Sequence, residues 1–464
     1  MLLSKENGWK KQTSETKELI FKFCEEYKIS LDLGKTEREY VQYGLKLAEE
    51  NGFVLAESKE KLVPGDKVYY VNRGKNLVLA IIGKEPLEKG LNYVVSHIDS
   101  PRIDLKQNPL YEELELSYMK THYYGGIKKY QWTSIPLSLH GVVVLENGER
   151  KNVVIGERDE DPVFTIPDLL PHLAAKVQGD RKTAEVIKGE ELQIIVGTIP
   201  TTLNNPEIKE TVKYAVLEEL NKAYGMIEED FISAEFQLVP AFKAKDVGID
   251  RSLVGGYGQD DRICGYTSLK AILSLNEIPN KTAVCFLADK EETGSNGSTG
   301  LQSNYLEYFT GDLISRTKDN YSDLFLRKAL WNSSSLSSDV SAAIDPIFKS
   351  VHEAQNAAKL NYGIVVTKFT GSRGKGGTND ADAEYVWEIR NILNKGDILW
   401  QTAELGKVDE GGGGTVAMYL AQLGIKTIDV GPALLAMHAP FEISSKLDIY
   451  ESYKAYKAFY KEMN

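Results

Sequence analysis

The chain has 464 residues, 42% of them hydrophobic and 26% charged, which is enough for two or three domains with buried cores. Its net charge of -12 argues against nucleic acid as a partner, because binding to phosphates needs clustered cations. The first 13 residues lack the apolar core of a signal peptide, and no run approaches the ~18 apolar residues of a membrane span. We therefore expect a cytoplasmic protein with no membrane partner, in which three scattered cysteines are reduced.

The predicted elements divide the chain into an α/β part and a more β-rich part. Residues 12–51 carry apolar positions at helical spacing and predict two helices. Strand-like runs follow at 67–71, 77–82 and 93–96. Residues 105–238 alternate short β-like runs with turns, and strands alternate with helices beyond residue 239. The sequence therefore predicts an α/β domain formed by 1–104 and 239–464, interrupted by an inserted domain at 105–238.

Polar residues gather at the ends of predicted strands in five short stretches. They are Ser96–Ser100, Gln259–Arg262, Asp289–Gly294, Ser338–Asp339 and Met437–Ala439. Two histidines and three acids at such positions suit two divalent ions with one bridging carboxylate. Glu291 is left over beside a ligand candidate, where a general base is needed. The set therefore indicates a two-metal hydrolase.

Each stretch taken alone has a simpler interpretation. His97-Ile98-Asp99 is a common structural pattern, and Glu291-Glu292 is a charged strand exit. The serine-rich stretch before Asp339 is typical of a capped turn, and a lone His438 is more often a core histidine. Five simple interpretations are improbable together, so the order of the stretches favours the metal site.

Other motifs favour no rival chemistry. Gly371–Thr378 resembles a phosphate loop but lacks the Gly-Lys-Ser/Thr ending. Gly411–Gly414 has no following lysine and favours the start of a helix. Residues 379–387 contain several acids but are better explained as a capped helix. No Gly-x-Ser-x-Gly elbow is present, so a serine hydrolase is not supported.

The motifs Ser-His-x-Asp-Ser-Pro, Asp-Asp-Arg, Glu-Glu-x-Gly-Ser, Ser-Asp and Met-His-Ala-Pro occur in this order. Together they resemble the aspartyl aminopeptidase, or aminopeptidase I, family of co-catalytic zinc exopeptidases, over nearly the whole chain. The resemblance implies a phosphorylase/hydrolase-like α/β catalytic domain with a mixed sheet. It also implies that the inserted β-rich domain serves dimerization.

The resemblance assigns five metal ligands: Asp260 as the bridging carboxylate, His97 and Asp339 at one ion, and Glu292 and His438 at the other. The implied ions are two divalent metals, zinc or else cobalt or manganese. Asp99 is implied to orient His97. The implied reaction is the release of N-terminal residues from peptides, in which a hydroxide bridging the metals attacks and Glu291 acts as general base.

Specificity and assembly also follow from the resemblance. Lys368 matches one of two polar anchors for an acidic substrate side chain, whereas Ala342 stands where acid-preferring members carry a histidine, which implies a broader or neutral preference. His172 matches a histidine that reaches into the neighbouring subunit's active site, as a catalytic and substrate-binding group. The implied assembly is a homo-oligomer of dimers that form a tetrahedral dodecamer.

Two other function classes remain open. One is a metal-dependent deacylase or carboxypeptidase of the same superfamily, which would accept peptides with a blocked amino end. The other is a non-catalytic assembly protein on the same scaffold. The five ligand positions are all filled by suitable residues, which favours an active enzyme.

Overall fold

The described residues, 5–202 and 207–463 of a computed structural model, form two compact units. The first unit comprises the chain up to Ser100, Ala244–Met437 and the residues from Phe441 onward. The second comprises Pro101–Lys243 and His438–Pro440. Most of the second unit is therefore a single long insertion in the sequence of the first unit. The domain boundaries at 105 and 238 remain a prediction.

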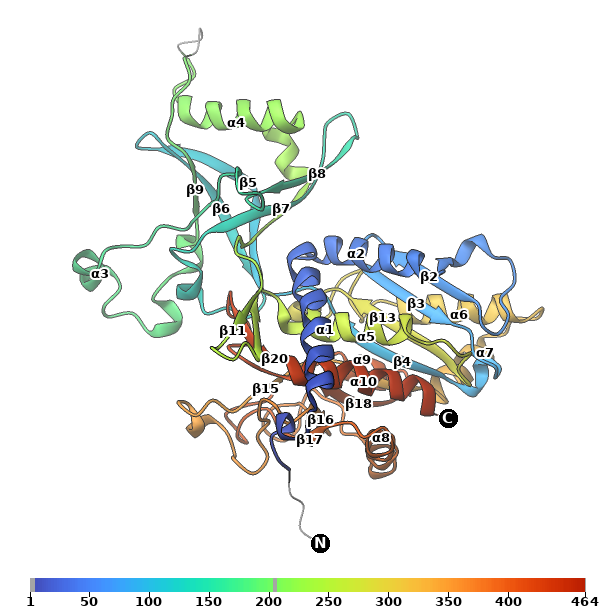
Figure 1. Ribbon diagram of the computed structural model, residues 1–464. Coiled ribbons are helices and arrows are strands. Elements are labelled where there is room, and N and C mark those ends of the chain that lie inside the picture. The colour runs from blue at the N-terminus through green and yellow to red at the C-terminus, as the bar shows by residue number, and fades with distance from the viewer. Residues whose placement is uncertain (1–4, 203–206, 464) are drawn as a thin grey trace. The chain divides into compact units, whose positions relative to one another are not determined.

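A mixed nine-stranded sheet is the centre of the first unit (Figure 1). In spatial order its strands are β1 (Val54–Leu55), β2 (Lys67–Asn72), β3 (Asn76–Ile81), β13 (Thr282–Ala288), β4 (Leu91–His97), β14 (Ser334–Ser337), β18 (Lys426–Gly431), β16 (Ile364–Thr367) and β17 (Trp400–Thr402). All residues of β4 and β13 are buried, and β13 is accordingly apolar from Ala283 to Ala288, whereas β4 also buries Asn92, Ser96 and His97.

Helices supply an apolar core on each face of this sheet. They are α1 (Ser14–Leu33), α2 (Glu37–Glu50), α5 (Gln259–Leu273), α6 (Tyr305–Thr317), α7 (Asp323–Trp331), α8 (Ala383–Lys395), α9 (Ala417–Gln422) and α10 (Lys446–Glu462). One core includes residues of α2, α5, α8 and α10, and the other includes residues of α6, α7 and α9. No helix among the described residues is long and apolar enough to cross a membrane.

The register of the parallel strands places three chain exits at one edge of the sheet. Ala288 at the end of β13 lies opposite His97 at the end of β4. Ser337 at the end of β14 lies opposite Val95, so the following residues reach the same edge. Carboxyl ends of parallel strands are where α/β sheets hold their ligands. The polar stretches identified in the sequence therefore meet because of this register.

A smaller five-stranded sheet completes the first unit. Its strands, in spatial order, are β11 (Lys245–Val247), β12 (Leu253–Gly256), β20 (Glu442–Ser445), β19 (Ala433–Leu435) and β15 (Ser341–Ala342). Strand β12 leads through a glycine-rich turn into α5, and the Asp260–Asp261 peptide bond at the start of α5 is cis. The small sheet thereby supplies the backbone that leads into Asp260.

The second unit is built on a six-stranded sheet of antiparallel pairs. Its strands, in spatial order, are β8 (Arg150–Ile155), β7 (Leu137–Val144), β10 (Ala234–Pro240), β5 (Arg102–Glu113), β6 (Leu116–Tyr124) and β9 (Ile194–Gly197). It also contains α3 (Pro171–Val177) and α4 (Thr211–Tyr224). The expected α/β fold with a β-rich insertion is confirmed by these sheets.

Two local interpretations differ from the structure. The serine-rich stretch before Asp339 is not a turn but the fully buried strand β14, in which Ser335 Oγ lies 3.0 Å from Thr427 Oγ1 of the adjacent strand. Short hydroxyl side chains can be buried because they find such partners. The helix expected from residue 379 begins at Ala383, where Asp382 caps it by accepting from the Tyr385 amide.

Candidate metal centre

Three segments of the first unit bring acidic side chains around His97. His97 ends β4, and Asp339 lies two residues beyond β14. Glu291 and Glu292 occupy the short 3-10 turn η8 (Glu291–Thr293), which follows β13. Asp260 lies in the non-helical first turn of α5. The five residues come from distant parts of the sequence and are joined by the sheet.

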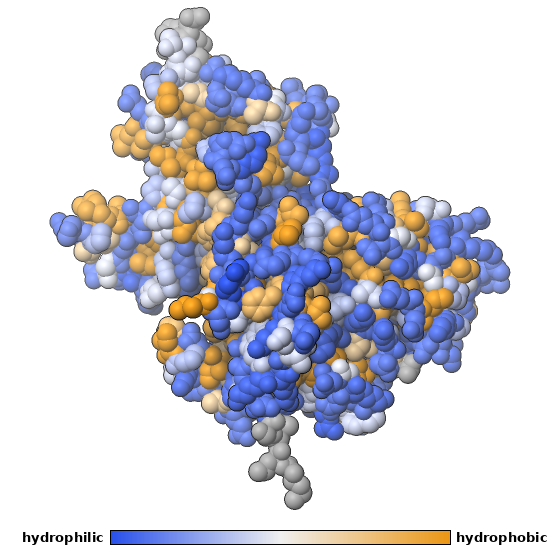
Figure 2. Space-filling model, viewed as in Figure 1, coloured by the Kyte–Doolittle hydropathy of each residue, from blue (hydrophilic) through white to orange (hydrophobic). Residues whose placement is uncertain are grey.

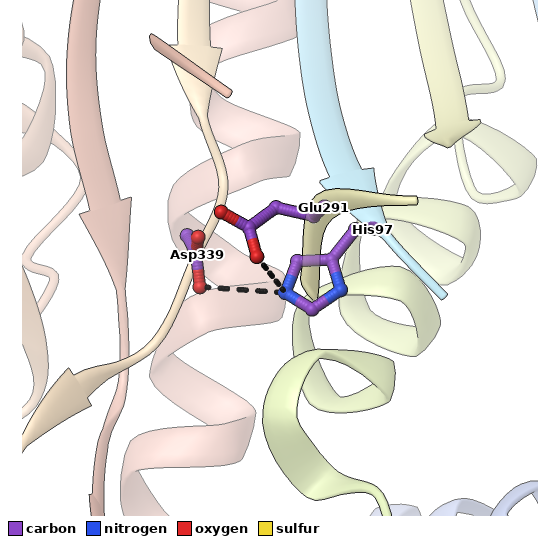
Figure 3. Close-up of side chains that lie close together, drawn as sticks. All are labelled: His97, Glu291 and Asp339. Carbon is purple, nitrogen blue, oxygen red and sulfur yellow. Dashed lines mark ion pairs between the residues drawn. The ribbon is translucent and has the colours of Figure 1, made fainter. Parts of the chain in front are cut away.

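Two groups of potential metal donors share His97. One consists of His97, Glu291 and Asp339, and the other of His97, Asp260 and Glu292; within each group the donor atoms lie within 4.8 Å of one another. The His97 Nε2 atom is 3.8 Å from Glu291 Oε2 and 3.8 Å from Asp339 Oδ1 (Figure 3). It is 3.1 Å from Asp260 Oδ1. One imidazole thus faces carboxylates from three segments.

The electrostatics of this cluster favour a bound cation. Burial, reinforced by the charges of Glu291 and Asp260 and opposed by His97, raises the pKa of Asp339 well above its ordinary value. Burial lowers the pKa of His97, but its hydrogen bonds with Asp260 and Asp99 hold it well above the usual range. Nitrogen and oxygen donors at these separations suit zinc and similar divalent ions. The residues present therefore fit the metal that the sequence predicts.

Asp99 contacts both sides of the cluster. Its main-chain oxygen is 3.0 Å from His97 Nδ1, and its carboxylate Oδ1 is 3.3 Å from the same nitrogen. The carboxylate also accepts hydrogen bonds from the amides of Glu291, at 3.1 Å, and Glu292, at 3.2 Å. The imidazole therefore has a hydrogen-bonding partner on its second nitrogen, as metal-ligating histidines require.

Sequence reasoning missed the contacts that hold the Asp260 backbone. Ser100 Oγ donates to the Asp260 main-chain oxygen at 2.7 Å. The Asp260 amide donates to Glu442 Oε2 at 3.1 Å, and Glu442 is buried in β20. An acid inside a short buried strand, four residues after His438, was the sequence signal that could have identified Glu442.

Besides Asp99, three predicted site residues lie outside both donor groups of the described chain. His438 belongs to the second unit, where its Nδ1 is 2.9 Å from the Gly126 main-chain oxygen. His172 is exposed on α3. Lys368 is half exposed just after β16, with its Nζ 3.8 Å from Asp380 Oδ1. The roles assigned to these three residues stay predictions.

The strand-edge cluster of one imidazole and four carboxylates on a mixed α/β sheet defines the class: a metal-dependent hydrolase. The sequence pattern of the aminopeptidase I zinc metalloproteases (M18) matches residues 31–460. The chain therefore belongs to this family and is a metalloaminopeptidase, a hydrolase of peptide bonds. This confirms the family suggested by the motifs.

Individual relatives agree with this assignment. A probable M18 family aminopeptidase 1 of Borrelia garinii is 56% identical over 461 residues, covering 99% of this chain and 100% of the relative. The crystal structure of an M18 aminopeptidase from Thermotoga maritima is similar with a TM-score of 0.95 and 47% identity over 100% of both chains. The yeast mApe1 dodecamer has a TM-score of 0.75 at 22% identity, covering 94% and 95%, and shares the fold.

Proposed function

We propose that this chain is a dinuclear-metal aminopeptidase that releases N-terminal residues from peptides, with Glu291 as its general base. The observation that carries the proposal is the pair of donor groups around His97, one containing Glu291 and the other Glu292. One imidazole and four carboxylates are more donors than one tetrahedral ion takes, which supports a second ion beside the first. Family membership supports the peptide-bond chemistry.

Five residues are proposed as ligands: Asp260 shared between the ions, His97 and Asp339 at one, and Glu292 and His438 at the other. Zinc is the proposed metal, as the family description implies, with cobalt and manganese as alternatives. When bound by these residues, the ions would supply Lewis acidity, which would lower the pKa of a bound water and polarise the peptide carbonyl.

The protein's own groups position and transfer the proton. Glu291 accepts a proton from the attacking water and returns it to the leaving amine. Its side chain is 18% exposed, whereas His97 is 1% exposed, and this partial exposure suits a group that must meet solvent and substrate. Asp99 supports Glu291 by accepting its amide hydrogen bond.

We also propose that the second unit acts as a dimerization domain inserted at 105–238 between catalytic parts 1–104 and 239–464. Helix α3 buries none of its residues, although the Leu173 and Val177 side chains are apolar. Apolar surface over the α3 segment is visible in orange in Figure 2. A helix this short is stable mainly when its apolar side chains pack against another surface. The expected surface is a second copy of the chain, which would cover the exposed apolar side chains of α3.

The fold shared with the yeast dodecamer supports a homo-oligomer, and the proposed assembly is a tetrahedral dodecamer of dimers. Within it, His172 is proposed to reach the neighbouring subunit's site. Lys368 is proposed to contact the substrate side chain.

The test is a panel of chromogenic aminoacyl substrates with free or acetylated amino groups, assayed with zinc, cobalt or manganese. We expect cleavage of the free-amine substrates alone, and loss of activity on chelation. Cleavage of acetylated substrates instead would identify the deacylase or carboxypeptidase class. Elemental analysis gives the stoichiometry, and a purified protein without bound metal or activity would favour the non-catalytic assembly protein.

A further inference from the structure

Gly294 closes the turn that carries Glu291 and Glu292. The Gly294 amide donates to the Glu291 main-chain oxygen at 2.8 Å, and the Ser295 amide donates to the Lys290 main-chain oxygen at 2.7 Å. Gly294 has a φ of 81°, a left-handed conformation that glycine adopts at little cost. Its own carbonyl points out of the turn and is available to other parts of the chain.

Two side chains from outside the turn hold the Gly294 carbonyl. Tyr419, on α9, donates its hydroxyl to Gly294 O at 2.9 Å. Gln302, ahead of α6, donates Nε2 to the same oxygen at 2.7 Å. Gln302 Nε2 also lies 3.3 Å from the Tyr419 hydroxyl, so the two donors contact each other. We call Tyr419 and Gln302 the Gly294 clamp.

The helix α9, which carries Tyr419, is also held near the strand that leads to Asp339. Thr415, just before α9, donates its hydroxyl to Asp429 Oδ1 at 2.7 Å. Asp429 of β18 lies opposite Ser337 of β14. Ser337 precedes Asp339 by two residues in the sequence. The segment 415–419 therefore joins the Asp339 strand end to the turn of Glu291.

We infer that Tyr419 and Gln302 are positioning residues that keep the Glu291 carboxylate in place through the Gly294 carbonyl. This inference rests on the proposed role of Glu291 as general base. A base works only within hydrogen-bonding reach of the proton it accepts, and a 1 Å displacement can lower a rate by about a hundredfold. A metal ligand on the same turn is held by its ion as well, so Glu291 depends on the clamp more than Glu292 does.

The test compares Tyr419→Phe, Gln302→Met and the double variant, each assayed with zinc bound. Because either donor can hold the carbonyl, we expect small effects from the single variants. The double variant should lose about tenfold in kcat while KM, zinc content and melting temperature stay near those of the wild type. Tyr308→Phe, a substitution of an exposed tyrosine on α6, is the matched control and should change none of these quantities.

Repeating the clamp substitutions in a Glu291→Gln background distinguishes positioning of Glu291 from a merely structural role of the clamp. If the clamp acts through Glu291, the double clamp variant causes little further loss of residual turnover there. An equal tenfold loss in both backgrounds would overturn the inference, as would a kcat that falls only in proportion to zinc content. Full turnover by Glu291→Gln itself would instead refute the proposed function.

Discussion

Glu291 and Glu292 are neighbours in sequence, yet their carboxylates join different donor groups around His97. The separation begins at the backbone, where the two amides donate to different oxygens of Asp99. The tight 3-10 turn then directs successive side chains away from each other. One residue can therefore bind metal while the adjacent one remains a base.

Glu291→Gln is expected to lower kcat by ~10²–10⁴-fold with metal content and fold retained, because an amide cannot accept the proton. Glu292→Gln is expected instead to lose metal. Both variants are measured by steady-state kinetics together with elemental analysis. The opposite pattern of metal loss would show that the two roles are exchanged.

Substrate preference is predicted at the position three residues after Asp339. Ala342 cannot hydrogen bond to a substrate carboxylate, so discrimination in favour of N-terminal aspartate over leucine should be weak. Lys368→Met should lower kcat/KM for the aspartyl substrate by roughly tenfold and leave the leucyl substrate unaffected, since a charge-assisted hydrogen bond is lost. A strong aspartyl preference in the wild type would contradict the prediction.

At the level of elements, a cluster of charges connects α1, α10 and the hairpin of β11 and β12. Asp246 contacts Lys28 Nζ at 2.6 Å, Lys446 Nζ at 2.8 Å and Arg251 Nε at 2.7 Å. The Lys446 side chain is fully buried. Because an isolated buried charge is costly, Asp246 is required to compensate Lys446.

Asp246→Asn should lower the free energy of unfolding by about 3–5 kcal/mol, since it leaves the buried Lys446 with only the longer contact of 3.7 Å to the half-exposed Glu25. The matched control, Arg251→Gln, removes an exposed partner and should cost less than about 1 kcal/mol. Urea unfolding near neutral pH measures both. Equal stability of wild type and Asp246→Asn would refute the assignment.

The stabilities of the wild type and Asp246→Asn can also be compared as a function of pH. Burial raises the pKa of Asp246, but hydrogen bonds from Lys28, Lys446 and Arg251 outweigh burial and hold it below the ordinary value. The stabilisation is therefore complete above the pKa of the unfolded chain, ~3.9, and is lost as pH falls further. The stability difference between wild type and Asp246→Asn should shrink below about pH 4.

At the level of the whole molecule, catalysis is predicted to require more than one subunit. We predict that His172 donates a hydrogen bond to the tetrahedral oxyanion in the neighbouring subunit's site. His172→Phe should therefore retain metal and assembly but lose most activity, because such a donor is worth ~2.7–4 kcal/mol where it has been removed. Mixing its subunits with Glu291→Gln subunits should restore some activity, since mixed pairs contain one site with both groups. Mixed oligomers that form without any recovery would exclude a shared site.

The sequence by itself determined the strands that are buried on both faces and the family of the protein. The run Thr282–Ala288 is apolar after its first residue and forms β13 with those bounds. The order of the motifs was enough to identify the family. The chemistry requires a particular residue type at each ligand position, and this requirement is visible in the sequence even where the ligands lie far apart in the chain.

Only the tertiary structure decided which polar groups support these motifs. Glu442 meets the Asp260 amide across 182 positions, and Tyr419 meets Gly294 across 125. The start of α8 was also settled in three dimensions, because Asn379 donates to Thr427 and Asp380 pairs with Lys375, which leaves Asp382 as the cap. Local periodicity carries no information about partners as distant as Glu442 and Tyr419, because the packing of the folded chain brings them together.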